Sequence, residues 1–258
     1  MKHLCVAHRG FSGIAPENTL AAFRLALEQS FVHWIELDVQ VSKDGVPVVI
    51  HDFTLERTTN GTGRIKDSDW KELQQLDAGS WKNAECLGEK IPTLAQVLDL
   101  CHGRVSLNIE LKTTGDMYPG LEKAVLREIM MREMQNEVVL TSFDRSALRR
   151  TKELNPEIRT GLIIDARPDD LAKQLEKLQC SFLSIGYPHL DRYLLRDLTG
   201  RGITVMAWTV DDCRIMRRLS ALHPDLMICT NWPDRWEQAF LLSKRRMWHY
   251  IRKLIRFR

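Results

Sequence analysis

The amino-acid sequence predicts an α/β protein in which eight strands and eight helices alternate and close into a (β/α)8 barrel. Short runs rich in β-branched residues alternate with segments of helical, 3.6-residue periodicity along the chain. The length of 258 residues suits one large domain, and single α/β barrels commonly reach this size. Eight βα units in series favour a closed barrel over an open doubly wound sheet.

The expected strands are short and mostly apolar. They are residues 4–8, 34–39, 105–112, 137–142, 160–164, 182–186, 203–209 and 226–230. The expected helices are 16–30, 93–101, 117–133, 144–154, 169–179, 190–198, 211–222 and a segment from 234 onward. Pro16 suits a first helical turn, and Asp144 and Asp211 suit helix N-caps.

A β-hairpin is expected directly after the first helix. Glu36 and Asp38 alternate with apolar residues, so their carboxylates share one strand face. A turn centred between Asp44 and Gly45 would bring His51 back opposite Asp38. Two carboxylates beside an imidazole indicate a hard-cation site with an acid/base group at its edge. The alternative is an exposed edge hairpin with unrelated charges.

The excess of residues over a minimal barrel lies in 53–92. This segment is polar, contains glycines and is helical only at 68–76. We interpret it as a small insertion that covers the barrel mouth within the single domain 1–258.

Composition limits the class of protein. The six cysteines form no Cys-x-x-Cys pair, and no 18-residue apolar segment or signal-like N-terminus is visible. The sequence therefore favours a cytoplasmic protein with reduced thiols. The net charge is only +3, and seven of the 37 Lys and Arg residues lie in 244–258. Because the basic charge is concentrated in that tail, a nucleic-acid partner is not expected.

The tail 244–258 has apolar residues at helical spacing with basic residues mostly off that stripe. Such a basic amphipathic helix can make peripheral contact with the inner membrane surface. The alternatives are a continuation of the last barrel helix or a dimer contact.

Polar residues fall at the C-terminal ends of the expected strands, where barrels of this kind hold their functional groups. They are His8 and Arg9, Glu36 and Asp38, Asn108, Glu110 and Lys112, Ser142, Trp208, and Thr230 and Asn231. A cation held by Glu36, Asp38 and Glu110 would have only oxygen ligands, which suits Mg²⁺, Ca²⁺ or Mn²⁺ and disfavours zinc.

Arg9 and Lys112 would place positive charge beside that cation, which indicates a phosphate ester as ligand. His8 and His51 can divide proton removal from the nucleophile and proton delivery to the leaving alkoxide. The alternative for each is a hydrogen-bonded structural histidine. Trp208 is either a wall for the substrate or part of the barrel packing.

The ordered motifs resemble those of the glycerophosphodiester phosphodiesterase family. They are Ala-His-Arg-Gly at 7–10, Pro-Glu-Asn-Thr at 16–19, Ile-Glu-Leu-Asp-Val at 35–39, Val-Ile-His-Asp at 49–52 with Arg-Thr-Thr at 57–59, Asn-Ile-Glu-Leu-Lys at 108–112 and Ala-Trp-Thr-Val at 207–210. The likeness runs from the first strand to about Pro233. The chain departs at Asn231, where the family commonly has Asp.

The resemblance implies a TIM barrel that uses a divalent cation to hydrolyse small glycerophosphodiesters to sn-glycerol 3-phosphate and an alcohol. It implies His8 and His51 as the catalytic pair and Glu36, Asp38 and Glu110 as metal ligands. It further implies Arg9 and Lys112 as phosphate contacts, with Glu17 orienting neighbours near the mouth. Two rival interpretations stay open: lysophospholipase D-like activity at a membrane surface, and a non-catalytic barrel that binds phosphodiesters.

Overall fold

A computed structural model describes residues 4–240 of the chain, and the tail prediction for 244–258 lies outside that range. Within it, eight parallel strands form a barrel. They are β1 (Cys5–His8), β2 (Val32–Val41), β4 (Ser106–Leu111), β5 (Val138–Ser142), β6 (Thr160–Ile164), β7 (Phe182–Gly186), β8 (Thr204–Trp208) and β9 (Met227–Thr230). Pairing of β1 with both β9 and β2 closes the sheet, so the predicted (β/α)8 fold is confirmed.

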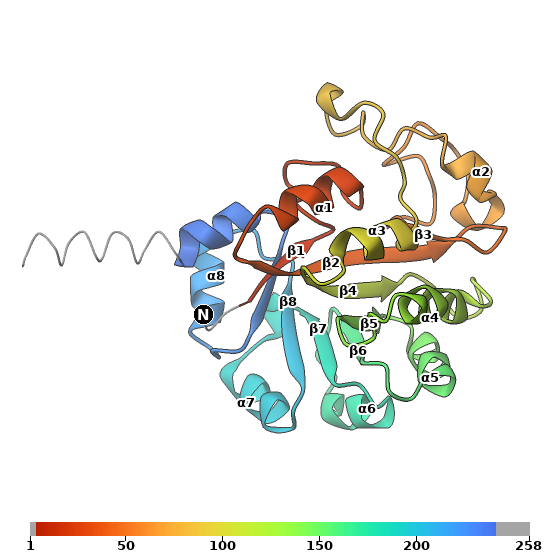
Figure 1. Cartoon of the computed structure of the whole chain (residues 1–258). Helices are drawn as coiled ribbons and strands as arrows, with labels where there is room; N and C mark the ends of the chain where they lie inside the picture. Colours follow the sequence, from red (N-terminus) through yellow and green to blue (C-terminus); the bar gives the residue numbers. More distant parts are fainter. Residues whose placement is uncertain (1–3, 241–258) are drawn as a thin grey trace, which may run out of the picture.

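Helices form the outer layer of the barrel (Figure 1). They are α1 (Leu20–Leu27), α3 (Leu94–Cys101), α4 (Leu121–Met131), α5 (Arg145–Leu154), α6 (Leu171–Lys177), α7 (Arg192–Gly200) and α8 (Cys213–Ser220), and residues 233–240 are also helical. Within residues 4–240, no helix combines the length and hydrophobicity needed to cross a bilayer.

Strand side chains alternate between the barrel interior and the layer beneath the helices, as the two-residue period of a strand requires. Val6, Phe182 and Met206 belong to a cluster inside the barrel, whereas Cys5 and Ala7 pack in the large core shared with the helices. Glu36 and Asp38 share the face of Trp34, which packs against the interior cluster. The acidic face of β2 therefore points into the barrel.

Several helix starts differ from the prediction. The helix expected from residue 117, for example, begins at Leu121 as α4. Helix α1 begins at Leu20 with Thr19 as N-cap, so Pro16 lies in the turn before it. Helix α8 is capped by Asp212, whose side chain accepts from the N–H groups of Arg214 and Ile215. The neighbouring Asp211, expected as that cap, turns toward Asn231 instead.

The hairpin forms, but its register differs by one residue from the prediction. Strand β3 (Pro47–Val49) pairs antiparallel with β2, with Val49 opposite Val39. A three-residue loop between Ser42 and Val46 replaces the expected two-residue turn, and Gly45 in it has φ +86°. Ile50, and not His51, therefore lies opposite Asp38, with its N–H 3.0 Å from the Asp38 carbonyl oxygen.

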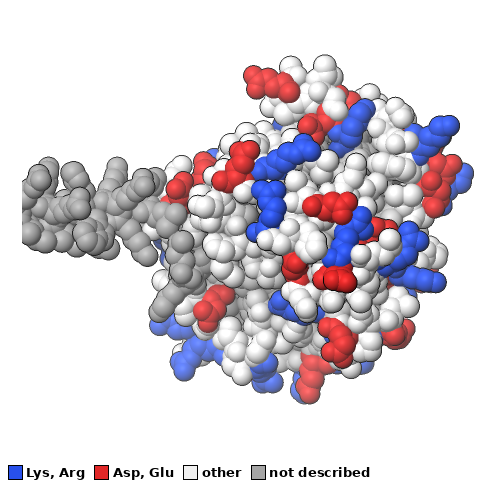
Figure 2. All heavy atoms as spheres, in the orientation of Figure 1, with Lys and Arg blue, Asp and Glu red and all other residues white. Residues whose placement is uncertain are grey.

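Residues 53–92 contain the short helices η1 (Ile65–Asp67), α2 (Trp70–Leu73) and η2 (Ala84–Cys86), and extend beyond the β2–β3 hairpin (Figure 1). Leu55, Ile65 and Leu73 pack in a separate small cluster with Val48 and Ile50. Lys82 Nζ donates to the Ser12 carbonyl oxygen at 2.7 Å, which joins the segment to the loop after β1. On the face that Figure 2 shows, acidic and basic side chains are interspersed.

Candidate active site

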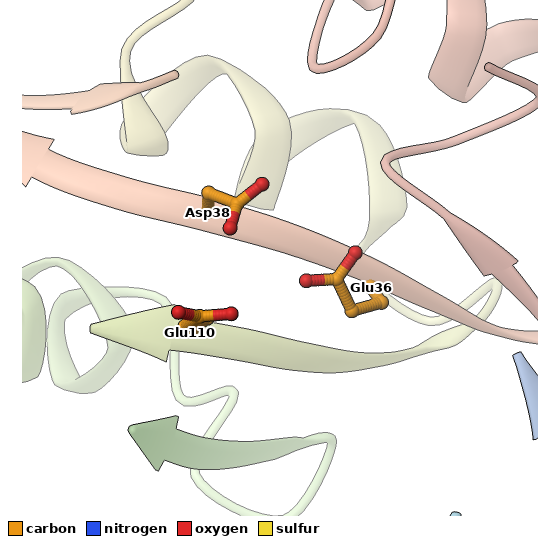
Figure 3. Close-up of side chains that lie close together, drawn as sticks. All are labelled: Glu36, Asp38 and Glu110. Atoms are coloured by element: carbon orange, nitrogen blue, oxygen red, sulfur yellow. The ribbon is translucent and has the colours of Figure 1, made fainter. Parts of the chain in front are cut away.

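Three carboxylates converge inside the C-terminal mouth of the barrel. Strand β2 contributes Glu36 and Asp38, and β4 contributes Glu110, which lies opposite Asp38 in the parallel register. One oxygen from each carboxylate lies within 4.8 Å of the other two, and all three residues are buried (Figure 3). The sequence prediction that these three side chains meet is therefore correct in geometry.

Burial and mutual repulsion shift the pKa values of these carboxyl groups. Burial, and then the charge of Asp38, raises the pKa of Glu36 well above its ordinary value and raises the pKa of Glu110 to about 7. Burial alone would raise the pKa of Asp38 as well, but Arg9 and other cationic neighbours hold it below its ordinary value. Ionisation of all three carboxyl groups at once therefore requires further positive charge beside them.

The residues present fit a divalent cation. Asp38 Oδ1 is buried and accepts no hydrogen bond within residues 4–240, although Lys112 Nζ lies 3.9 Å away, whereas Oδ2 accepts from Asn18 Nδ2 at 2.8 Å. A buried carboxylate oxygen that accepts no hydrogen bond is costly unless a cation lies close enough to satisfy it. Since the three converging side chains supply only oxygen, a hard ion such as Mg²⁺, Ca²⁺ or Mn²⁺ matches the donor set.

Arg9 lies beside the carboxylates through an unusual backbone conformation. Its φ of 54° is in the left-handed region, which a non-glycine residue adopts only when surrounding contacts hold it. Its backbone N–H donates to Glu36 Oε2 at 3.0 Å, and its Nη1 donates to Glu17 Oε1 at 2.7 Å. Its Nε lies 3.2 Å from Asp38 Oδ2. Arg9 is therefore fixed at the acidic cluster.

Lys112 extends from the end of β4 into the same mouth. Its Nζ lies 3.0 Å from Glu110 Oε1 and 3.2 Å from His51 Nε2. The lysine thus connects an acidic side chain to an imidazole. Asn108, two residues before Glu110, accepts from the Thr141 hydroxyl at 2.6 Å, so it lies deeper in the barrel.

The two predicted histidines both line the same pocket as Glu36 and Glu110. His8 Nδ1 lies 2.7 Å from Asn231 Oδ1, and its Nε2 lies 3.7 Å from Glu36 Oε2. His51 Nδ1 lies 2.6 Å from Asp52 Oδ1. Burial lowers the pKa of His8 to about 4, and burial also lowers the pKa of His51.

Arg57, from the segment after the hairpin, joins two supporting carboxylates. Its Nε donates to Asp52 Oδ2 at 2.6 Å, and its Nη2 donates to Glu17 Oε1 at 2.7 Å. Because Asp52 contacts His51 and Glu17 contacts Arg9, this one guanidinium links the partners of two site residues.

The opposite side of the pocket is apolar. Trp208 at the end of β8 meets Phe143 edge to face, with ring centroids 5.9 Å apart, and Ile163 and Met206 complete this wall. Trp208 Nε1 is buried and has no hydrogen-bond partner in the part of the chain that the structure describes. Ser142, expected at the mouth, instead donates to the Leu111 carbonyl oxygen.

Sequence reasoning missed four contributors to the site. Asn18 binds Asp38, Phe143 forms part of the wall, and Asp211 contacts the Asn231 amide. Arg57 was part of a matching motif but had no assigned contact. All four are brought to the site by loops, where strand periodicity predicts no direction for a side chain.

The closed barrel and the acidic, basic and imidazole groups at its mouth define a class, the (β/α)8 hydrolases of phosphate esters. The model of the "Glycerophosphoryl diester phosphodiesterase family" matches residues 8–235, and the chain belongs to that family. The resemblance inferred from the motifs is thereby confirmed, and the chain is an enzyme, a phosphoric diester hydrolase.

Individual relatives and solved structures agree with this family membership. The chain is 37% identical over 220 residues to a glycerophosphodiester phosphodiesterase of Caldanaerobacter subterraneus subsp. tengcongensis, covering 85% of this chain and 90% of that one. It is 36% identical to an Oleispira antarctica phosphodiesterase solved in complex with the product sn-glycerol-3-phosphate, with TM-score 0.86 over 92% of this chain and 96% of that one. It is 31% identical to a glycerophosphodiester phosphodiesterase of Agrobacterium tumefaciens, with TM-score 0.79 over 90% of this chain and 98% of that one.

Proposed function

We propose that this enzyme hydrolyses glycerophosphodiesters to sn-glycerol 3-phosphate and an alcohol, with one divalent cation. The observation that carries the proposal is the convergence of three buried carboxylates with two imidazoles and two cationic side chains in one pocket. The family membership and the product named for the Oleispira relative support the same substrate class.

Glu36, Asp38 and Glu110 would hold the cation, since their oxygens lie within 4.8 Å of one another. When bound, such an ion withdraws charge from a phosphate oxygen and helps to orient the ester. Arg9 and Lys112 would contact the remaining phosphate oxygens, because both cations lie at the edge of the acidic cluster. Glu17 would orient Arg9, which donates to it, and Asn108 would support the site from its position opposite Glu36 on the neighbouring strand.

His8 and His51 act as the acid/base pair in this proposal. Each has its Nδ1 held by a neighbouring acceptor, Asn231 Oδ1 for His8 and Asp52 Oδ1 for His51. That arrangement directs both Nε2 atoms toward the pocket, where His8 Nε2 lies 3.7 Å from Glu36 Oε2 and His51 Nε2 lies 3.2 Å from Lys112 Nζ. Both Nε2 atoms would exchange protons with the attacking and leaving oxygens there. Trp208, with its unpaired Nε1, would contact the substrate from the apolar side.

The direct test is release of glycerol 3-phosphate from glycerophosphocholine by the full-length enzyme. We expect turnover that EDTA abolishes and that Mg²⁺, Ca²⁺ or Mn²⁺ restores. Turnover unaffected by prolonged chelation would contradict the cation site. Binding of glycerophosphocholine without any turnover, with each cation tried, would instead support the non-catalytic barrel, and faster turnover of lysophosphatidylcholine would support the lysophospholipase D-like activity.

A further inference from the structure

Asn231 connects the His8 imidazole to a carboxylate outside the pocket. Its Oδ1 lies 2.7 Å from His8 Nδ1, and its Nδ2 donates to Asp211 Oδ2 at 2.8 Å. Asp211 lies between β8 and α8, and its Oδ1 accepts at 2.9 Å from both the Asn231 backbone N–H and the Thr230 hydroxyl. Three hydrogen bonds thus hold the Asp211 carboxylate against the last residue of β9 and the residue after it.

The chemistry of these groups fixes the direction of each hydrogen bond. An ionised carboxylate only accepts, so the Asn231 amide nitrogen must face Asp211 and its oxygen must face His8. The amide oxygen also only accepts, so His8 Nδ1 must carry the hydrogen. The Ser12 hydroxyl lies 2.9 Å from the same amide oxygen and 2.7 Å from the His8 carbonyl oxygen, and its one hydrogen can go to either, so the orientation of the amide rests on Asp211. A neutral imidazole carries one N–H, so His8 Nε2 keeps its lone pair.

We propose that Asp211 is a positioning residue that, by orienting the Asn231 amide, holds neutral His8 in the Nδ1–H tautomer with Nε2 free to accept a proton. The inference rests on the proposed function, in which His8 exchanges a proton with the substrate. A carboxylate at position 231 could by itself accept the hydrogen bond from His8 Nδ1. In this chain, Asp211 and Asn231 fill that role together.

The substitution D211N should reverse this chain of hydrogen bonds. The remaining oxygen at position 211 can still accept from Thr230 and from the Asn231 backbone, so local folding is preserved. The new amide nitrogen, however, would face the Asn231 amide nitrogen, and the Asn231 amide must turn over to avoid that contact. Its nitrogen would then donate to His8 Nδ1 and force the hydrogen onto Nε2.

The substitution N231D alone should also impair the site. It would place a second carboxylate beside Asp211, where the structure has a 2.8 Å amide–carboxylate hydrogen bond. Two like charges at that distance repel. The double substitution D211N/N231D restores complementarity, because the carboxylate at 231 accepts both from His8 Nδ1 and from the amide at 211.

The test measures kcat and KM for glycerophosphocholine, with the cation that gives the highest rate, in the wild type, both single variants and the double variant. We expect each single variant to lower kcat by about 10²-fold with KM within about 2-fold, and the double variant to recover to within about 10-fold of the wild type. D212N is the matched control, because the adjacent Asp212 caps α8 through Arg214 and Ile215. It should leave kcat unchanged.

A spectroscopic measurement tests the tautomer without relying on turnover. Long-range ¹H–¹⁵N correlation of the histidine rings at pH 8 with Mg²⁺, with His8→Ala to assign the His8 signals, should show the Nδ1–H form in the wild type and the Nε2–H form in D211N. An Nε2–H tautomer in the wild type would overturn the inference even if the variants fail to fold. So would a double variant no faster than the slower single variant. A wild type without turnover but with the Nδ1–H form would refute the proposed function and leave the tautomer assignment standing.

Discussion

The two sides of the barrel mouth differ in charge, and the difference follows strand order. On the side of β1, β2 and β4, parallel register places His8 beside Glu36 and Asp38 beside Glu110. On the side of β6, β7 and β8, the pocket is lined by Ile163, Ser184, Met206 and Trp208.

Adjacent strands in register can bring charged groups within a few ångströms, which an ion site requires. The charged side is therefore suited to the reacting phosphate, and the uncharged side is suited to the rest of the substrate. Substitutions on the two sides should have different kinetic consequences.

The largest difference is expected between Glu110→Gln and Ser184→Ala. Removing one anionic ligand should lower kcat by on the order of 10³-fold, because the cation contributes several kcal/mol to the transition state. It should also reduce the rise in Tm that Mg²⁺ produces in the wild type, since a ligand stabilises the fold according to its affinity. Ser184→Ala, a small change on the uncharged side, should alter kcat by less than about 3-fold. Equal losses in the two variants would remove the distinction.

The second largest loss of kcat is expected from substitution of the two histidines. His8→Ala and His51→Ala should each lower kcat by about 10²-fold or more while leaving the circular dichroism spectrum and the Mg²⁺-dependent Tm shift intact, because neither is an expected metal ligand. His102→Ala, at an exposed position beside Glu137, is the matched control and should keep wild-type turnover. Near wild-type rates in both site variants would exclude the acid/base assignment.

The strand-borne part of this site could be predicted from the sequence, and the loop-borne part could not. Glu36, Asp38 and Glu110 were predictable because side-chain direction alternates along a strand and parallel strands end at one edge. His51 was expected beside the carboxylates and does line their pocket, but the expected register was wrong, since the length of the turn after Ser42 shifts the pairing by one residue.

Asp211 illustrates the limit more clearly. Two consecutive aspartates precede α8, and either can cap a helix N-terminus. The choice depends on the Asn231 amide, which is 20 residues further along the chain and reaches Asp211 only through the pairing of β8 with β9. Local sequence pattern carries no information on such a contact.

Arg57 offers a smaller effect on the charged side. Arg57→Ala should lower kcat by about 10-fold, because His51 and Arg9 would both lose a neighbour that orients their carboxylate partners. Arg57→Lys keeps the charge but not the two-pronged geometry, so an intermediate rate is expected. Arg132→Ala is the control, since Arg132 forms a comparable pair of contacts with Asp99 and Glu128 on the outer helices. It should not change kcat, and a similar loss in both alanine variants would refute the role of Arg57.

The smallest effect is expected on the uncharged side. Phe143 is 45% exposed and packs edge to face on Trp208, so Phe143→Ala should loosen the wall without touching the phosphate contacts. We expect KM for glycerophosphocholine to rise by roughly 3-fold to 10-fold, in line with about 1 kcal/mol for an aromatic pair, and kcat to stay within about 2-fold. Phe143→Leu, which keeps an apolar side chain, should restore part of the affinity. A fall in kcat with unchanged KM would place the reacting phosphate on the uncharged side of the mouth. It would thus contradict the assignment of the phosphate to the charged side.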